Sequence, residues 1–149
     1  MHRVSQASLA LAAKRAAPRY QAKILVAEDS PDAREMLQVL LERKGYAVVS
    51  ARDGFEAVDV AIHALPDLIL LDLELPGLDG LSVTTELRLH PGLEKIPIIV
   101  ISGHDPEIYR AAAMNAGCND YLLKPIDFSR LDKVLHESIP QHFVQVRTA

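Results

Sequence analysis

The stretch Leu68-Ile69-Leu70-Leu71-Asp72 decides the fold, because four aliphatic residues run directly into a carboxylate. Three other aliphatic runs share this pattern and end on Glu28-Asp29, on Ser102 and on Lys124-Pro125. Short aliphatic runs bounded by turn signals are typical of buried parallel strands. Ligands of open parallel sheets bind beyond the carboxyl ends of the strands, so we expect these polar groups at one edge of one sheet.

Strand and helix signals alternate five times from residue 23 to residue 140. Each expected helix follows a side chain that caps helix N-termini, namely Ser30, Asp53, Asp79, Asp105 and Asp127. The alternation predicts an α/β fold, a doubly wound five-stranded parallel sheet of flavodoxin-like order 2-1-3-4-5 with helices on both faces. In that order the chain reverses direction between the first and third strands, so Glu28-Asp29 and Asp72 should meet there.

Apolar spacing predicts the buried face of several helices. In the first helix this face consists of Ala33, Met36, Leu37, Leu40 and Leu41. In the second helix it consists of Phe55, Val58, Ile62 and Leu65, and in the last helix of Phe128, Leu131, Val134 and Leu135.

The composition is that of one globular domain, with 149 residues, 49% hydrophobic and 24% charged. The single cysteine, Cys118, excludes an internal disulfide, and its position after a helix-ending glycine predicts a core residue. The six histidines lack the spacing of a zinc site. No apolar stretch approaches the roughly 20 residues that cross a bilayer, and none resembles a cleaved signal, so we expect a cytoplasmic protein.

Charge is distributed unevenly along the chain. Residues 1–23 hold five basic groups and no acidic one, while the chain as a whole has a formal charge of −4. We therefore expect a basic, disordered tail over residues 1–22, an acidic domain over 23–140 and a short tail over 141–149. An acidic domain argues against nucleic acid as its partner. An alternative for the first tail is a weak helix that touches an acidic partner or a lipid surface.

The clustered carboxylates indicate a divalent cation. Carboxylates brought together repel one another, and a hard cation such as Mg²⁺ (or Mn²⁺) with oxygen ligands relieves that repulsion. A carboxylate beside such an ion is also a nucleophile for a phosphoryl group. Lys124 would then supply a positive charge and Ser102 a hydroxyl donor, while Gly103 leaves space for a phosphate.

From about Lys23 to Pro140 the sequence resembles a response-regulator receiver domain of two-component signalling, of the single-domain, chemotaxis-regulator-like kind. The matching segments are Glu28-Asp29, residues 72–80, Ser102-Gly103 and residues 116–125. Each segment is weakly specific alone, but all four occur in order, each at a predicted strand end.

The resemblance implies a role for each matching residue. Asp72 would accept a phosphoryl group from a phosphohistidine. Mg²⁺ would be held by Asp29, Asp72 and the backbone carbonyl of Glu74, with Glu28 acting partly through water. Lys124 would bind a phosphate oxygen in front of a cis peptide to Pro125. Ser102 would move toward the phosphoryl group while Tyr121 turns inward as a switch.

The resemblance also implies partners and an output surface. The donor would be a sensor histidine kinase or a phosphotransfer protein, and the protein would catalyse only its own phosphorylation and dephosphorylation. Because no output domain is expected after Pro140, the signal would pass to a target protein, to a phosphotransfer protein or into a phosphorylation-linked dimer. The surface that changes would be the one formed by the fourth helix, the fifth strand and the fifth helix.

Two rim residues depart from many relatives. Glu74 lies two residues after Asp72, and we predict that its side chain reaches the mouth of the site and tunes the lifetime of the phosphoryl group. His104, two residues after Ser102, is either a solvated rim residue or a positive charge near the phosphate below about pH 6.5.

Two other functions fit parts of the pattern. A dehalogenase-like phosphatase also uses an aspartate and Mg²⁺, but its Asp-x-Asp motif lies on the first strand, and here Asp72-Leu73-Glu74 lacks the second Asp. A degenerate receiver acting only as a scaffold would not be expected to keep Asp72, Ser102 and Lys124.

Overall fold

The computed structural model describes residues 21–140, which form five strands and five helices. The strands are β1 (Lys23–Ala27), β2 (Ala47–Ala51), β3 (Leu68–Asp72), β4 (Ile98–Ser102) and β5 (Asp120–Leu123). All neighbouring strands pair in parallel in the order β2-β1-β3-β4-β5, which confirms the predicted topology.

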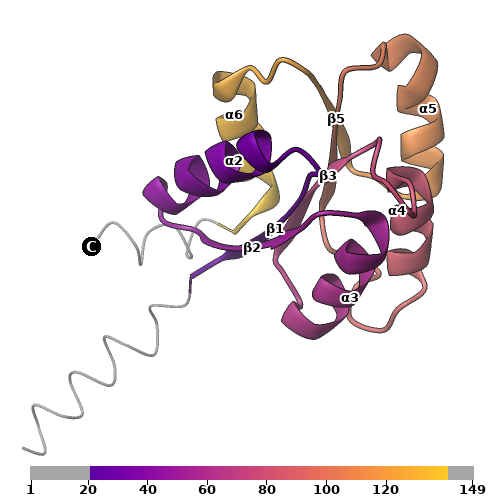
Figure 1. Ribbon diagram of the computed structural model, residues 1–149, viewed down its shortest axis with the longest axis horizontal. Helices are drawn as coiled ribbons and strands as arrows, with labels where there is room; N and C mark the ends of the chain where they lie inside the picture. The colour runs from indigo at the N-terminus through magenta and orange to yellow at the C-terminus, as the bar shows by residue number, and fades with distance from the viewer. Residues whose placement is uncertain (1–20, 141–149) are drawn as a thin grey trace, which may run out of the picture.

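The helices are α2 (Pro31–Arg43), α3 (Gly54–Ala64), α4 (Gly80–Arg88), α5 (Pro106–Ala116) and α6 (Phe128–Ser138). Each begins after its predicted cap, whose side chain accepts a backbone N–H of the first turn. Helices α2 and α6 cover one face of the sheet, and α3, α4 and α5 cover the other (Figure 1). The fold is therefore the predicted three-layer α/β arrangement.

The central strand β3 is buried over its whole length, as is β4. Alternate residues of the strands point to the two faces of the sheet, so the core divides into two clusters. One cluster joins the sheet to α2 and α6 through residues such as Leu37, Leu41 and Leu131. Because both ends of a buried strand are fixed by this packing, Asp72 at the end of β3 has a well-defined position.

The predicted inner face of α3 is partly wrong. Phe55 and Leu65 are exposed, while the fully buried positions of the helix are Gly54, Ala57 and Ala61. Small residues face inward because α3 packs closely against the sheet and α4. The apolar spacing in the sequence favoured larger side chains at this face. Val58 and Ile62 pack against the core as predicted.

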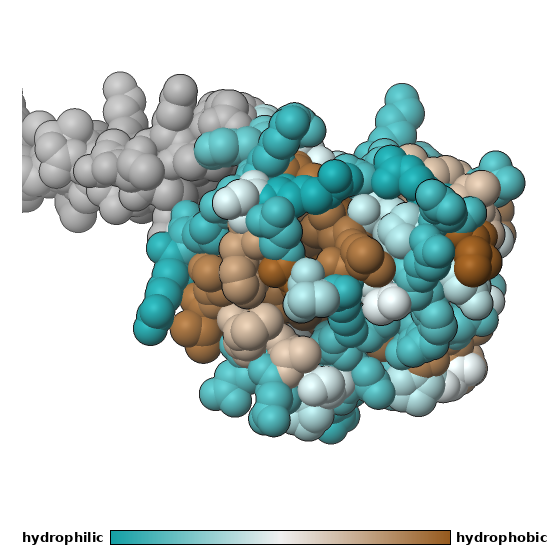
Figure 2. All heavy atoms as spheres, turned by 90° about the horizontal axis from the view of Figure 1, so that it is seen from above, coloured by the Kyte–Doolittle hydropathy of each residue, from teal (hydrophilic) through white to brown (hydrophobic). Residues whose placement is uncertain are grey.

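Two further predicted core residues lie at the surface. Met36 of α2 is 47% exposed and Phe128 of α6 is 44% exposed, whereas Leu37, Leu131, Val134 and Leu135 are buried. Both side chains line an open groove together with strand residues such as Leu70 and Ile101, so no other side chain covers them fully. Figure 2 shows that apolar surface is exposed in patches between hydrophilic side chains on one face of the molecule.

Arg88 at the end of α4 ties three segments together. Its guanidinium donates hydrogen bonds to the carbonyls of Gly117, Leu93 and Ile96 and to Oδ1 of Asn119. Nearby, Cys118 is buried, as predicted, and its thiol lies 3.4 Å from Thr84 Oγ1. Burial raises the pKa of this thiol, and the Thr84 hydrogen bond and the charge of Arg88 oppose that effect only in part.

Most of the two predicted tails lies outside the described residues. Within residues 21–140 no helix combines the length and the apolarity required to span a bilayer. Ala22, immediately before β1, is buried, and its carbonyl accepts the N–H of Ala47.

Candidate functional site

Three carboxylates meet at the carboxyl edge of the sheet. Glu28 and Asp29 follow β1, and Asp72 ends the neighbouring strand β3. Each offers an oxygen that lies within 4.8 Å of those of the other two. The strand order brings these residues together, as the sequence analysis expected.

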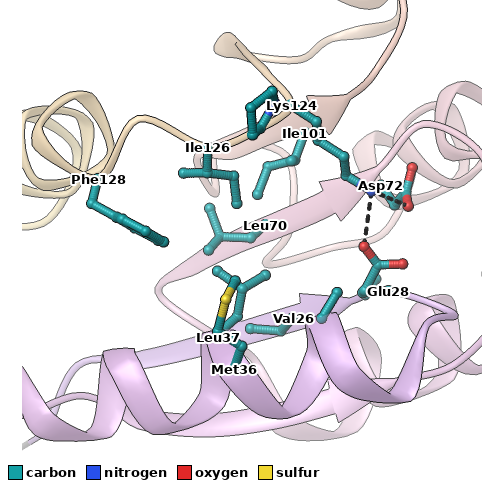
Figure 3. A pocket seen from close by; sticks show the side chains of 13 residues that line it. Val26, Glu28, Met36, Leu37, Leu70, Asp72, Ile101, Lys124, Ile126 and Phe128 are labelled. Atoms are coloured by element: carbon teal, nitrogen blue, oxygen red, sulfur yellow. Dashed lines mark hydrogen bonds and ion pairs between the residues drawn. The ribbon is translucent and has the colours of Figure 1, made fainter.

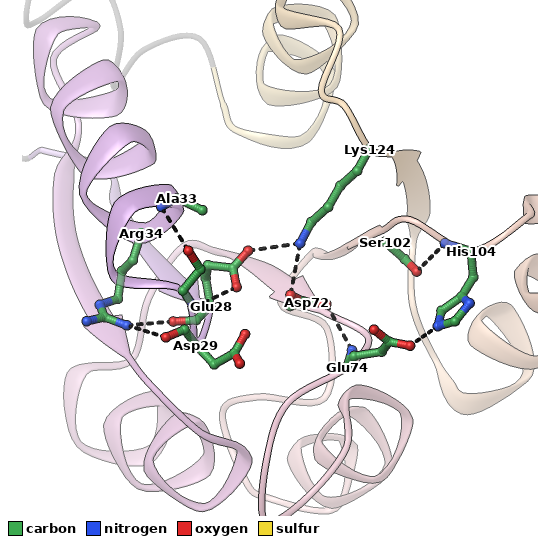
Figure 4. A network of polar contacts seen from close by, with 10 residues as sticks. Glu28, Asp29, Ala33, Arg34, Asp72, Glu74, Ser102, His104 and Lys124 are labelled. Atoms are coloured by element: carbon green, nitrogen blue, oxygen red, sulfur yellow. Dashed lines mark hydrogen bonds and ion pairs between the residues drawn. The ribbon is translucent and has the colours of Figure 1, made fainter.

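Lys124, which follows directly after β5, extends its side chain to Glu28 and Asp72 (Figure 4). Its ammonium lies 2.9 Å from Glu28 Oε1 and 3.0 Å from Asp72 Oδ2, so one cation bridges both buried carboxylates. Burial lowers the pKa of Lys124, but the hydrogen bonds and charges of Glu28 and Asp72 outweigh burial and raise it. The ammonium is therefore charged at neutral pH. The peptide bond to Pro125 is cis, as the resemblance implied.

The backbone of the acidic pair is held by α2. Arg34 donates to the carbonyl of Glu28 at 2.8 Å and to that of Asp29 at 3.4 Å. The N–H of Ser30 donates to Glu28 Oε2 at 3.1 Å, so both carboxylate oxygens of this buried residue have a donor. Asp29 is exposed, and it is the only one of the three carboxylate residues that is not buried.

The carboxylate of Asp72 is held from two directions. The backbone N–H of Glu74 donates to Oδ1 at 2.9 Å, and Lys124 donates to Oδ2. Asp72 itself is only 7% exposed. These two contacts fix the orientation of a carboxylate that is largely shielded from water.

Ser102 and Tyr121 converge on the backbone of His104. Ser102 Oγ accepts the N–H of His104 at 3.0 Å, and the buried Tyr121 hydroxyl donates to the carbonyl of His104 at 2.9 Å. Ser102 ends β4 beside β3, where Ile101 pairs with Asp72. A side chain added at Gly103 would meet no atom within 4 Å, so the space above this loop is open.

The two rim residues are joined to each other. Glu74 Oε1 contacts His104 Nε2, and the imidazole also packs against Tyr109 with ring centroids 4.6 Å apart. This contact links the loop after β3 to the loop after β4 on the side of Asp72 opposite Lys124 (Figure 4). The side chain of Glu74 thus reaches the mouth of the site, as predicted.

An apolar groove of about 280 Å³ adjoins the site (Figure 3). Val26, Leu70 and Ile101 form its floor, and Met36 and Phe128 stand on opposite walls. Glu28, Asp72 and Lys124 close one end of the groove. A partner that fills this groove would therefore lie directly beside the Asp72 carboxylate.

The donor set suits a hard divalent cation. Its side-chain donors are three carboxylates, whose oxygens Mg²⁺ prefers, and Asp29 is the exposed member of the three. Glu28, Asp29 and Asp72 carry three negative charges, and Lys124 neutralises only one of them. The remaining charge favours binding of a cation.

Sequence reasoning did not predict two contacts at this site. The backbone contacts of Arg34 were missed because a basic residue on a helix reads as solvated. The pairing of Glu74 with His104 was missed because it joins loops 30 positions apart, although both residues had been assigned to the rim.

The fold and the site define a flavodoxin-like domain with an acidic centre at its topological switch point. Residues 24–136 match the response regulator receiver domain family. The chain belongs to this family, and the resemblance drawn from its four segments is confirmed.

Similar proteins support this assignment. Protein PilH of Pseudomonas aeruginosa is 34% identical over 115 residues, which cover 77% of this chain and 95% of that protein. The chemotaxis protein CheY4 of Vibrio cholerae has a similar structure, with a TM-score of 0.76 and 28% identity over 80% of this chain and all of that one.

A second similar structure contains the cation that the site suits. The receiver domain of a sensor histidine kinase from P. aeruginosa has a magnesium ion coordinated in its active site cleft. Its TM-score is 0.72 and its sequence is 33% identical, over 85% of this chain and 99% of that domain.

Proposed function

We propose that this protein is a phosphorylation-dependent response regulator whose phosphoryl acceptor is Asp72. The observation that carries the proposal is the bridge from Lys124 to both Asp72 and Glu28, with Asp29 alongside. The donor is a phosphohistidine of a sensor histidine kinase or of a phosphotransfer protein, and the reaction takes place in the cytoplasm.

The reaction exchanges one bond to phosphorus for another. An oxygen of the Asp72 carboxylate attacks phosphorus, the bond between phosphorus and the imidazole nitrogen breaks, and the nitrogen keeps the electron pair and takes up a proton. Charge on the transferred group develops beside the Lys124 ammonium, which stabilises it. The Glu74 N–H, bonded to Asp72 Oδ1, leaves the other carboxylate oxygen facing Lys124.

The proposed cofactor is Mg²⁺ or Mn²⁺. Asp29, Asp72 and the carbonyl of Glu74 would hold the ion, with Glu28 contributing through water. When bound, the ion neutralises charge on the phosphoryl oxygens. Arg34 would support this role by fixing the turn that carries Asp29.

The proposed output begins at Ser102. If its hydroxyl turns to a phosphoryl group on Asp72, the hydrogen bond from the His104 N–H is lost. The backbone carbonyl of His104 also accepts the Tyr121 hydroxyl. A shift of His104 would therefore be transmitted to Tyr121 in β5. The α5-β5-α6 surface would then alter its affinity for a target protein or for a second copy of the chain.

The groove beside Asp72 is the proposed contact for the donor protein. Met36 and Phe128 are about half exposed on its walls, although both are large apolar side chains. A helix of the donor that covers them would bring its phosphohistidine to the end of the groove closed by Asp72.

The alternative function of a dehalogenase-like phosphatase is not supported by the residue at position 74. A dehalogenase-like enzyme needs a second acid two residues after its nucleophile, directed at the leaving group. Here the side chain of Glu74 turns to His104 instead.

The test is phosphorylation by a small donor. The protein is incubated with Mg²⁺ and acetyl phosphate, and the intact mass is measured. We expect one added phosphoryl group on the wild type and on Asp32→Asn, which alters an exposed acid of α2, and none on Asp72→Asn. Added mass on Asp72→Asn would overturn the assignment of Asp72.

A further inference from the structure

The loop between β3 and α4, residues 73–79, determines how the acceptor carboxylate is held. It carries the Glu74 N–H that donates to Asp72 Oδ1 and the Glu74 carbonyl proposed to face the cation. Its C-terminal half folds back, because the Gly80 N–H donates to the carbonyl of Leu73 at 2.9 Å. The position of this loop therefore bears directly on the site.

The first turn of α3 packs against this loop. The N–H of Gly54 donates to the carbonyl of Pro76 at 3.1 Å. A Cβ at Gly54 would lie only 1.7 Å from the carbonyl oxygen of Leu78, so only glycine permits this approach. The backbones of helix and loop are thus in direct contact.

Phe55 holds the same loop from outside. A Cβ at Gly77 would lie 2.9 Å from Cδ2 and 3.1 Å from Cε2 of the Phe55 ring, so the ring rests on Gly77. Gly77 has φ +80°, a conformation that glycine adopts at little cost. Ring and turn fit together because position 77 has no side chain.

The exposure of Phe55 calls for a reason other than core packing. The residue is 65% exposed, and the buried positions of α3 are Gly54, Ala57 and Ala61. A side chain that leaves most of its surface in water adds little to the stability of the domain. Its ring instead contacts Gly77, in the same loop that carries the Glu74 N–H bonded to Asp72.

We propose that Phe55 is a positioning residue for the acceptor site, and that its ring fixes the Pro76-Gly77 turn and through it the Glu74 backbone. This inference rests on the proposed function, since it concerns how the cation and the Asp72 carboxylate are held. Removal of groups that orient metal ligands commonly weakens metal binding by about 10- to 100-fold. Because Phe55 acts on the Glu74 backbone through one intervening turn, we expect its removal to weaken Mg²⁺ binding at the lower end of this range, by about tenfold.

The test measures Mg²⁺ binding by isothermal titration calorimetry with MgCl₂, alongside the thermal midpoint. We expect Phe55→Ala to weaken Mg²⁺ binding about tenfold and to shift the backbone amide resonance of Glu74, with little change in midpoint. Leu89→Ala is the matched control, because it truncates another exposed apolar residue, 76% exposed, away from the loop. Phe55→Tyr keeps the ring and should restore binding.

The outcomes separate this inference from the proposed function. Wild-type affinity in Phe55→Ala, or an equal loss in Leu89→Ala or Phe55→Tyr, would overturn the role of Phe55 while leaving that of Asp72 intact. Failure of the wild type to bind Mg²⁺ or to accept a phosphoryl group would instead overturn the proposed function.

Discussion

Replacing Lys124 by Met tests the charge balance of the site. The substitution removes an ammonium that lies 2.9 Å from Glu28 and 3.0 Å from Asp72 and leaves the carboxylates of both without their cation. A unit ion pair at about 3 Å is worth roughly 1.4 kcal/mol in a water-like dielectric and roughly 5.5 kcal/mol at an effective dielectric of about 20.

Partial solvation of Lys124 places the energy of each ion pair nearer the smaller of these two values. The Lys124 side chain is 35% exposed, whereas Glu28 is almost fully buried. Removing the partner of a fully buried charge costs about 3–5 kcal/mol. With screening by water, we expect Lys124→Met to lower the free energy of unfolding by about 1–3 kcal/mol when no divalent cation is present.

Added Mg²⁺ should narrow this loss of stability. A divalent cation neutralises the same carboxylates as the Lys124 ammonium. Because the variant lacks this competing ammonium, the cation should bind the variant more tightly than the wild type. Saturation at about 100 times the dissociation constant stabilises a folded protein by about 2.7 kcal/mol. The gap between variant and wild type should therefore shrink as MgCl₂ is raised, in urea unfolding followed by far-ultraviolet circular dichroism.

The control is Lys133→Met, which removes an exposed lysine of α6. It should leave both stability and its Mg²⁺ dependence unchanged. If Lys124→Met is as stable as the wild type, or if Mg²⁺ leaves the difference in stability constant, the Lys124 bridge is not what neutralises the carboxylate cluster.

The pH dependence of stability gives a second check. Because the pKa of Lys124 is raised in the folded protein, the contribution of Lys124 to stability is complete below pH 10.5 and is lost as the pH rises through the higher folded-state value.

Three further predictions concern the rim, the α4 terminus and the thiol. Glu74→Gln should remove the negative charge from the mouth of the site, weaken the pairing with His104 and shorten the lifetime of the phosphorylated form about two- to tenfold; unchanged decay of the phosphorylated mass would contradict this. Arg88→Met should lose about 2–4 kcal/mol in urea unfolding, because several carbonyls lose their donor, and a loss below about 1 kcal/mol would contradict it. Cys118 should react with iodoacetamide at least about 100-fold more slowly when folded than in urea, since its thiol is buried and its pKa raised; equal rates would show that it is accessible.

Local signals were enough to predict the topology and the meeting of the acidic residues. Each helix has a cap at its start, and β3 is a run of aliphatic residues, so element order followed directly. A parallel sheet then brings the carboxyl ends of its strands to one edge, whatever the details of packing. Asp72 and Lys124 were thus placed together although they are 52 positions apart.

Features that depend on close packing were not predictable in this way. Spacing favoured Phe55 as a core residue of α3, yet the buried positions hold Ala57 and Ala61, because the helix lies close to its neighbours. The hydrogen bonds of Arg88 and the pairing of Glu74 with His104 depend on where loops come to rest. No periodicity in the sequence carries that information.

The position of Tyr121 gives the protein an optical probe of its own. The chain has no tryptophan and four tyrosines, so near-ultraviolet signals come from few chromophores. Tyr121 is 2% exposed, and its hydroxyl donates to the carbonyl of His104, whose N–H donates to Ser102 Oγ. In the proposed switch the Ser102 hydroxyl rearranges, which would alter the environment of this phenol, so near-ultraviolet circular dichroism would follow the proposed switch without a label.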